Sequence, residues 1–261
     1  WSSDVCSSDL TGSAVHDAFT IAAEGSTYNG NAGDDTFTTT VAILVADGAT
    51  DVVLAGGAGT DTLTVTGNNT TLTDNHFTNV SAFEKLTFTG TQDVSVTSGT
   101  AFNSGFASGV TITDGVTATT KNVTYALGLS NVDATIVSIG GSQTGATTED
   151  VNITTGSGAD TVTFSAAGWI GEAGAGGELN ISTGAGADTI SVTTGTLLAV
   201  TGGTGGATIT GGTGADTITT VHVNGGTTGN INYVVADGDS LVGGRDVITG
   251  FDIGGGAGAL Y

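Results

Sequence analysis

The residues whose type and spacing best suit a chemical role are aspartates that follow glycine-rich turns. The pattern is Gly-x-Gly-x-Asp-Thr followed by an apolar residue and then Thr or Ser. It occurs at 57–64, 156–163, 184–191 and 212–219, with looser copies at 31–38 and 243–248. Asp160, Asp188 and Asp216 are 28 residues apart, and Asp246 follows Asp216 after 30. This period predicts a repeat in which equivalent aspartates of successive coils lie above one another.

Calcium is the ion that this pattern suits. It takes about six to eight oxygens from carboxylates and backbone carbonyls, and glycine permits the positive φ angles that turn carbonyls toward an ion. One aspartate in a turn cannot supply so many oxygens, but two stacked turns can. Magnesium is less suited because it retains water molecules. The predicted calcium ligands are Asp35, Gly57, Gly59, Asp61, Gly156, Gly158, Asp160, Gly184, Gly186, Asp188, Gly212, Gly214, Asp216, Gly244 and Asp246. In the alternative interpretation each copy is only a turn, whose aspartate bonds to its own backbone.

The segments between the turns must position these aspartates. Apolar and polar residues alternate with a period of two at 61–66, 110–113 and 151–154, which is typical of half-buried strands. The apolar residue after each Asp-Thr should face the core, and the threonines on both sides of it should face outward. These core positions are Leu63, Val162, Ile190 and Ile218. We therefore expect an all-β fold, a parallel β-solenoid with glycine-rich calcium-binding turns.

Four segments differ in character. Residues 1–10 match the translation of a sequencing-adapter oligonucleotide at all ten positions, so we exclude them from the design of the fold and expect the natural N-terminus to lie elsewhere. Residues 11–67 form a β segment with calcium-type turns, and 151–261 a regular solenoid with a C-terminal end segment. The stretch 68–150 lacks the calcium motif but keeps β-rich runs such as 83–90 and 133–139. We interpret it as a continuation of the same architecture, with a separate β-sandwich domain as the alternative.

The composition excludes several classes of protein. Only 3 residues are Lys or Arg against 25 Asp or Glu, which gives a formal net charge of −22. Nucleic acids and anionic membrane surfaces would repel such a chain. The sequence contains no apolar run of the length that a membrane-spanning helix needs. The single Cys lies in residues 1–10, so the remainder can form neither a disulfide framework nor a zinc–cysteine cluster.

The repeats resemble the calcium-binding nonapeptide of repeats-in-toxin (RTX) proteins, Gly-Gly-x-Gly-x-Asp-x-aliphatic-x. The stretch 246–251 resembles the Asp-x-Ile-x-x-Phe sequence that commonly follows such blocks, and 79–90 is similar to β-strand repeats of bacterial surface-layer proteins and giant adhesins. The resemblance implies a parallel β-roll that holds calcium between its coils. The copies here are isolated rather than tandem, and the usual Asp-x-Ile-Asp-Leu ending is absent.

Enzymatic and ice-binding functions are the remaining alternatives. The histidines (His16, His76 and His222) have no metal-ligand spacing, and no nucleophile-elbow, His-Glu-x-x-His or phosphate-loop pattern occurs. We therefore expect no catalysis, although some parallel β-helix proteins act on polysaccharides. Outward threonine pairs such as Thr62 with Thr64 would form flat ladders like those of ice-binding solenoids. Threonine is also common at exposed strand positions for reasons of β-propensity alone.

Together these features predict a structural, calcium-stabilised β-solenoid at a bacterial cell surface, in a surface-layer protein. A calcium-dependent adhesin or the tail of a secreted toxin or enzyme shares the same turns. The expected partners are calcium ions, with self-association into a lattice or cell-surface glycans as further candidates, and neither nucleic acid nor membrane insertion. Millimolar extracellular calcium matches the affinities of extracellular modules, about 10⁻⁴–10⁻³ M. Binding would then contribute directly to folding.

Overall fold

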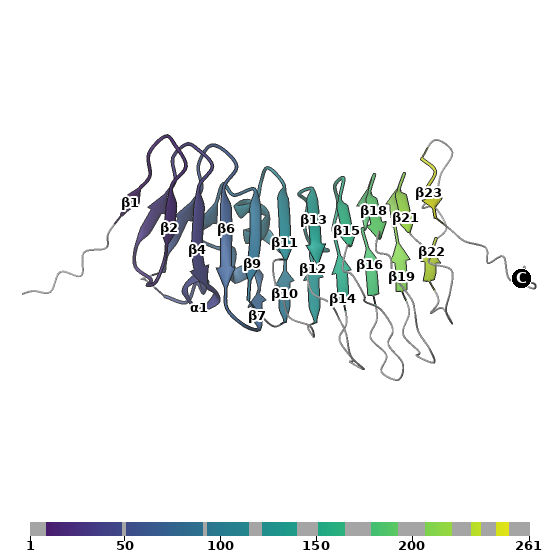
Figure 1. Cartoon of the computed structure of the whole chain (residues 1–261), viewed down its shortest axis with the longest axis horizontal. Helices are drawn as coiled ribbons and strands as arrows, with labels where there is room; N and C mark the ends of the chain where they lie inside the picture. Colours follow the sequence, from purple (N-terminus) through teal and green to yellow (C-terminus); the bar gives the residue numbers. More distant parts are fainter. Residues whose placement is uncertain are drawn as a thin grey trace, which may run out of the picture.

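Segments in which apolar and polar residues alternate form strands, and these strands stack in parallel to build a β-solenoid (Figure 1). The computed structural model describes residues 9–48, 51–90, 93–114, 122–139, 151–164, 179–192, 207–220, 231–235 and 244–250. The all-β parallel solenoid predicted from the sequence is confirmed. Residues 1–8 of the adapter-like segment and Phe251 of the C-terminal motif lie outside the described residues.

Two long parallel sheets form the walls of the solenoid, and shorter sheets complete it. The ten-stranded sheet contains, in order, β2 (Ala18–Thr20), β4 (Thr36–Thr40), β6 (Thr62–Thr66), β9 (Lys85–Thr89), β11 (Val110–Asp114), β13 (Ala134–Ile139), β15 (Thr161–Phe164), β18 (Thr189–Val192), β21 (Thr217–Thr220) and β23 (Val247–Thr249). The seven-stranded sheet contains β7 (Thr70–Leu72), β10 (Val94–Thr97), β12 (Val123–Ala126), β14 (Val151–Thr154), β16 (Leu179–Ser182), β19 (Ala207–Thr210) and β22 (Ile231–Val234). A four-stranded sheet near the N-terminus contains β1 (Leu10–Thr11), β3 (Thr27–Asn29), β5 (Val53–Ala55) and β8 (Val80–Ser81), and β17 (Ala185–Gly186) pairs with β20 (Thr213–Gly214).

The strands of the segment 68–150 belong to these same sheets. β9, β11 and β13 lie between β6 and β15 in the ten-stranded sheet, and β10 and β12 lie between β7 and β14 in the seven-stranded sheet. The strand segments predicted at 61–66, 110–113 and 151–154 appear as β6, β11 and β14. The coils without the calcium motif therefore stack directly on those that have it.

The strand register places like residues in columns. Between β15 and β18, for example, Thr161 pairs with Thr189 and Val162 with Ile190. The pairing of β11 with β13 shifts by one residue after Thr113. Because side chains alternate between the two faces of a strand, an unshifted register gives inner columns of apolar residues and outer columns of polar ones.

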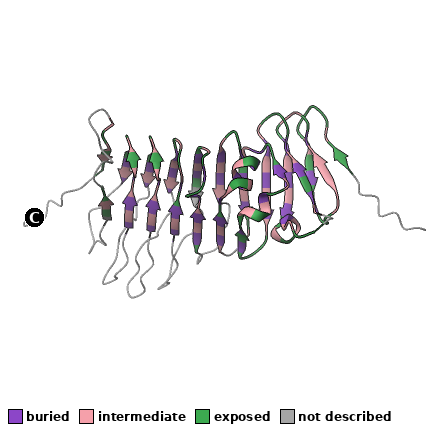
Figure 2. Ribbon diagram, turned by 180° about the vertical axis from the view of Figure 1, so that it is seen from behind, coloured by how far each residue is buried: buried purple, intermediate pink, exposed green. Residues whose placement is uncertain are grey.

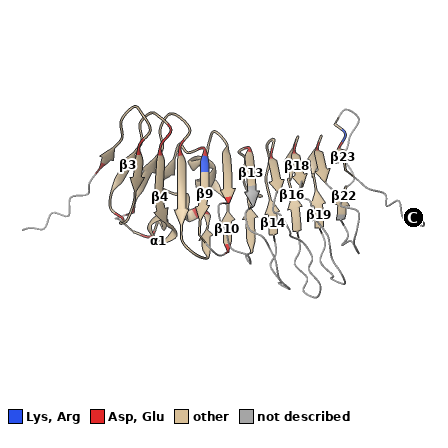
Figure 3. Ribbon diagram, viewed as in Figure 1, with Lys and Arg blue, Asp and Glu red and all other residues tan. Residues whose placement is uncertain are grey.

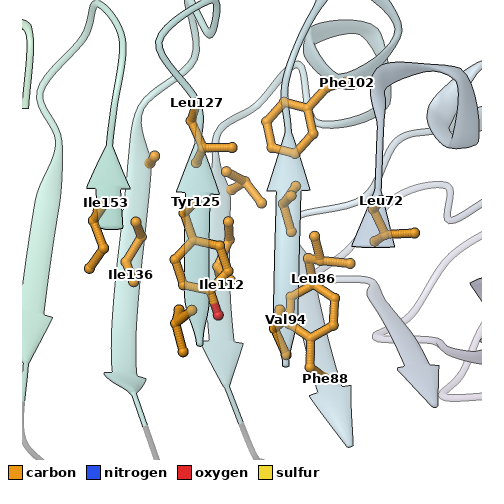
Figure 4. Close-up of a cluster of buried hydrophobic side chains, with 14 of the residues drawn as sticks. Leu72, Leu86, Phe88, Val94, Phe102, Ile112, Tyr125, Leu127, Ile136 and Ile153 are labelled. Atoms are coloured by element: carbon orange, nitrogen blue, oxygen red, sulfur yellow. The ribbon is translucent and has the colours of Figure 1, made fainter. Parts of the chain in front are cut away.

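The inner columns form one continuous hydrophobic core, as Figure 2 shows by the alternation of buried and partly exposed residues. The predicted core positions Leu63, Val162 and Ile190 are fully buried, and Ile218 is 4% exposed, so this prediction is confirmed. In the first and middle coils the core also contains aromatic rings. Figure 4 shows the middle cluster, where the rings of Phe88 and Tyr125 are stacked with their centroids 6.4 Å apart.

Short helical turns interrupt the strands in the first half of the described chain: α1 (Val41–Leu44), the 3₁₀ turn η1 (Asp74–Phe77) and α2 (Thr100–Gly105). The carboxylate of Asp74 accepts hydrogen bonds from the backbone N–H groups of Ala101 (3.2 Å) and Phe102 (2.8 Å), which caps α2. The ring of Phe77 then packs edge-on against Phe102, with the centroids 5.1 Å apart. No described helix has the length and apolar character that crossing a membrane requires.

Candidate metal site: the acidic column

One register position, at the start of the strands of the ten-stranded sheet, carries a carboxylate in most coils. We call these residues the acidic column: Asp17, Asp35, Asp61, Glu84, Asp160, Asp188, Asp216 and Asp246. The strand register aligns them from coil to coil, and Figure 3 shows the acidic residues gathered at strand ends. The predicted stacking of the motif aspartates is therefore present.

The side chain of most column residues accepts a hydrogen bond from the backbone of the coil before it. Oδ1 of Asp188 accepts a hydrogen bond from the backbone N–H of Asp160 (2.9 Å), and Oδ1 of Asp216 accepts one from the N–H of Asp188 (3.0 Å). The other links, acceptor first, are Asp35 to Asp17 (2.7 Å), Asp61 to Asp35 (2.8 Å), Glu84 to Asp61 (2.8 Å), Asp160 to Ala134 (2.7 Å) and Asp246 to Asp216 (3.1 Å). One carboxylate oxygen of each of these acceptor residues thus joins its own coil to the coil before it.

The second carboxylate oxygen is buried. Oδ2 of Asp35, Asp61, Asp160 and Asp188 is enclosed and accepts no hydrogen bond from the described part of the chain. These residues are at most 1% exposed. A buried charged oxygen without a partner is costly, so it requires a cation or a proton.

The pKa values follow from this environment. Burial raises the pKa of Asp188 to about 6, and the neighbouring carboxylates of Asp160 and Asp216 add to the rise, against an opposing contribution from hydrogen bonds. Burial likewise raises the pKa of Asp61 and of Asp160 above the ordinary value. The column therefore concentrates negative charge where water does not reach it.

In the first coils, a glycine five residues before the acid lets the backbone lie close to Oδ2. A Cβ on Gly56 would stand 2.8 Å from Oδ2 of Asp61 and closer still to the carbonyl oxygen of Ala82, in the next coil. A Cβ on Gly12 would stand 2.8 Å from Oδ2 of Asp17 and 2.6 Å from the carbonyl oxygen of Gly30. The face of each glycine is thus bordered by a carboxylate of its own coil and a carbonyl of the next coil, which are the two ligand types that calcium takes.

In the coils of Asp160 and Asp188, threonine takes the place of this glycine, which returns as Gly211 before Asp216. The hydroxyl of Thr155 donates to the carbonyl oxygen of Thr183 (2.8 Å), and the hydroxyl of Thr183 donates to that of Gly211 (2.8 Å). Because each hydroxyl proton is donated to a carbonyl, it is not available to the neighbouring carboxylate.

The turn glycines that the sequence singled out stack closely. Gly59 and Gly186 have φ angles of 144° and 149°, and a Cβ on Gly186 would overlap the carbonyl oxygen of Gly158 in the preceding coil. Only glycine suits such a position. The carbonyls of Gly156 and Gly184 each accept a hydrogen bond from the next turn (2.9 and 2.8 Å), which uses one lone pair of each oxygen. The same stacking continues through Gly57, Gly212, Gly214 and Gly244, which lie against the turn of the preceding coil.

Two members of the column, Asp17 and Glu84, were not predicted from the sequence, whereas its interruption falls within the stretch 68–150 that lacks the calcium motif. Asp17 lacks the turn glycines but follows Gly12 by five residues, the same spacing as Asp35 from Gly30. Glu84 replaces aspartate, and its longer side chain still reaches the N–H of Asp61. The column position is then occupied by Val110 and Ala134, two residues without a carboxylate.

The geometry is compatible with a cation between adjacent coils. Nowhere in the described ranges do three His, Cys, Asp or Glu side chains form one metal-binding group, so carbonyl and hydroxyl oxygens would have to complete any coordination shell. Beside the carboxylates, the carbonyl oxygens of Gly30 and Ala82, which border Gly12 and Gly56, are ligands of that kind. Comparison with models of known protein families, with curated proteins and with solved structures finds no match.

Proposed function

We propose that the chain is a structural β-solenoid of a bacterial surface protein, preferably of a surface layer, and that calcium bound along the acidic column stabilises it. The observation that carries this proposal is the enclosed, unbonded Oδ2 atom of Asp35, Asp61, Asp160 and Asp188. Backbone hydrogen bonds satisfy the other oxygen, so the column is held in place while part of its charge remains uncompensated.

Calcium bound at these positions would supply the positive charge that the column lacks. Asp160, Asp188 and Asp216 would contribute carboxylate oxygens in the C-terminal coils, and Asp17, Asp35 and Asp61 in the N-terminal coils. The turn glycines keep the coils close enough for carbonyls of one coil to border the acid of another. Ion binding would then be coupled to folding, since the unfolded chain does not preserve this arrangement.

A location outside the cell follows from the same chemistry. Millimolar calcium would saturate sites whose dissociation constants are about 10⁻⁴–10⁻³ M, whereas the much lower cytosolic concentration would leave them empty. The repeated carboxylates would then repel one another and weaken the folded state until export. The resemblance of the turns to RTX repeats supports this assignment.

Far-UV circular dichroism in chelator and then in millimolar calcium tests the proposal. We expect a stronger β signal and a higher melting temperature in calcium than in chelator, with a much smaller effect of magnesium at the same concentration and ionic strength. An identical spectrum and melting temperature in chelator and in calcium would remove the calcium-dependent part of the proposal.

Imaging by electron microscopy separates the surface-layer function from the adhesin function. A lattice protein should form two-dimensional sheets when calcium is added to the purified chain. A chain that remains monomeric in calcium and binds glycans or cells would support the adhesin instead.

A further inference from the structure

The outer face of the ten-stranded sheet carries threonine in two regular columns, a surface that we call the threonine face. Strands β4, β6, β11, β15 and β21 have threonine at both outward positions that follow the acidic column. In the other five strands of the sheet, β2, β9, β13, β18 and β23, one of the two positions is instead Ala18, Lys85, Val137, Ser191 or Val247. The register brings these positions side by side in the sheet.

The threonine face is widest at β4, β6 and β9. There a third outward position is also threonine, so Thr64 has threonines on all four sides: Thr62 and Thr66 along its strand, and Thr38 and Thr87 on the adjacent strands. All five side chains are partly exposed. Thr64 is thus the centre of a block of hydroxyl and methyl groups.

The spacing of this block is set by the sheet. Parallel strands lie about 4.8 Å apart and alternate residues about 6.6 Å apart, so the threonines form a nearly rectangular grid. The branched Cβ restricts χ1, which keeps hydroxyl and methyl groups in repeated orientations. Figure 1 shows these strands stacked in a straight row, and nine gaps of about 4.8 Å extend the face over about 43 Å.

The charge distribution favours an uncharged, periodic ligand. Most acids of the chain lie at strand ends, and in the described strands Lys85 is the only charged residue among the outward positions of the threonine face (Figure 3). The seven-stranded sheet differs, because its outward positions mix Ser, Thr and Asn, and Nδ2 of Asn180 donates to Oδ1 of Asn152 (3.0 Å). The regular threonine grid is therefore a property of one face.

We propose that the threonine face binds ice. The grid spacings are similar to the oxygen repeats on a prism face of hexagonal ice. The methyl groups would order the adjacent water, and the hydroxyl groups would hydrogen-bond to it. Ligand recognition would rest on repetition across strands and not on any single pocket. This function is separate from calcium binding, which acts at the strand ends.

Thermal hysteresis and ice-crystal shape, measured in millimolar calcium with the β fold checked by circular dichroism, test the proposal. The unmodified chain should lower the freezing point below the melting point and facet ice crystals. Thr64→Tyr should reduce the hysteresis several-fold, because a large ring at the centre of the block prevents flat contact. Thr163→Tyr, on β15, should act in the same direction and serves as a second variant.

Thr124→Tyr is the matched control, because Thr124 is an outward, partly exposed threonine on the seven-stranded sheet. Its hysteresis should equal that of the unmodified chain. The proposal is overturned if the folded chain leaves ice growth unchanged, or if Thr124→Tyr and Thr64→Tyr lose activity equally. Binding of a crystalline polysaccharide or of a second copy through this face, without ice activity, would also overturn it.

Discussion

Replacing Asp188 by asparagine should have opposite effects on the metal-free and the calcium-bound protein. The side chain introduced by Asp188→Asn would keep an oxygen to accept the N–H of Asp160, a bond of 2.9 Å in the structure. Its amide nitrogen could donate to the hydroxyl oxygen of Thr183, whose proton already goes to the carbonyl of Gly211. The substitution therefore removes a buried charge while leaving the hydrogen bonds in place. In chelator, D188N should be at least as stable as the unmodified protein.

In calcium the same change should be destabilising. In millimolar calcium, a site with a dissociation constant of about 10⁻⁴ M is at about 10 times that constant and contributes about 1.4 kcal/mol to the free energy of unfolding. Asp188 stands between Asp160 and Asp216, so it borders two inter-coil positions, and its loss would cost about 1.5–3 kcal/mol. At about 2–4 °C per kcal/mol for a chain of this size, the calcium-induced rise in melting temperature should shrink by at least about 3 °C.

Thermal denaturation followed by circular dichroism, with and without calcium, measures both effects. Asp93→Asn is the control, because Oδ1 of Asp93 also accepts a backbone N–H, that of Asn122 (2.8 Å), but Asp93 lies outside the acidic column. This variant should keep the full calcium-induced shift. If D188N also keeps it, or is less stable than the unmodified protein in chelator, the column is a hydrogen-bonding device without a bound ion.

Four further results are expected. Phe37→Ala should lower the free energy of unfolding by about 3–5 kcal/mol in chemical denaturation, because Phe37 is fully buried and its ring packs on Phe19 at a centroid distance of 4.7 Å. Gly186→Ala should destabilise by more than about 1 kcal/mol, since its φ is 149° and a Cβ would overlap a carbonyl, whereas Gly48→Ala, with nothing within 4 Å, should change stability by less than about 0.5 kcal/mol. In chelator the melting temperature should rise as the pH falls from 7 to 5. The pKa of Asp188 is raised from 3.8 to about 6, so the folded chain binds this proton more tightly than the unfolded chain. The stabilisation by protonation is therefore complete below pH 3.8 and is lost as the pH rises through 6. Hydrogen exchange in chelator should be faster in β16–β21 than in β9–β12, and equal protection of the two regions would contradict a local role for calcium.

Much of the fold was predictable because strand periodicity and the turn motif agree. The period-two segments at 61–66 and 151–154 became strands, and Leu63 became fully buried as the alternation required. The common spacing of Asp160, Asp188 and Asp216 also predicted their vertical alignment. Local pattern and repeat length specify the same register, so either one supports the other.

Other features depend on contacts that no local pattern encodes. The helix α2 contains Thr100, Ser104 and Gly105, which are weak helix formers, and it is held by the carboxylate of Asp74 from the preceding coil. The sequence likewise does not show toward which coil each column carboxylate points. A Gly-x-Gly-x-Asp pattern does not show that Oδ1 bonds to the preceding coil, because that partner is 26 to 30 residues away in sequence.

The interior of the solenoid changes where the acidic column is interrupted. At Val110 and Ala134 the column carries no charge, and nearby coils bury the rings of Phe102, Phe106 and Tyr125, side chains that each remove about 150–250 Å² from water. The described core of β16–β21 contains aliphatic side chains and the buried Thr220 but no aromatic ring, and there the column is acidic and adjacent threonines donate to carbonyls. The first coils differ, because they combine stacked carboxylates with the buried rings of Phe37 and Phe83. Apolar burial is thus smallest in the C-terminal coils. A bound cation would stabilise the C-terminal coils, whose apolar core is small, and the middle coils would not require it.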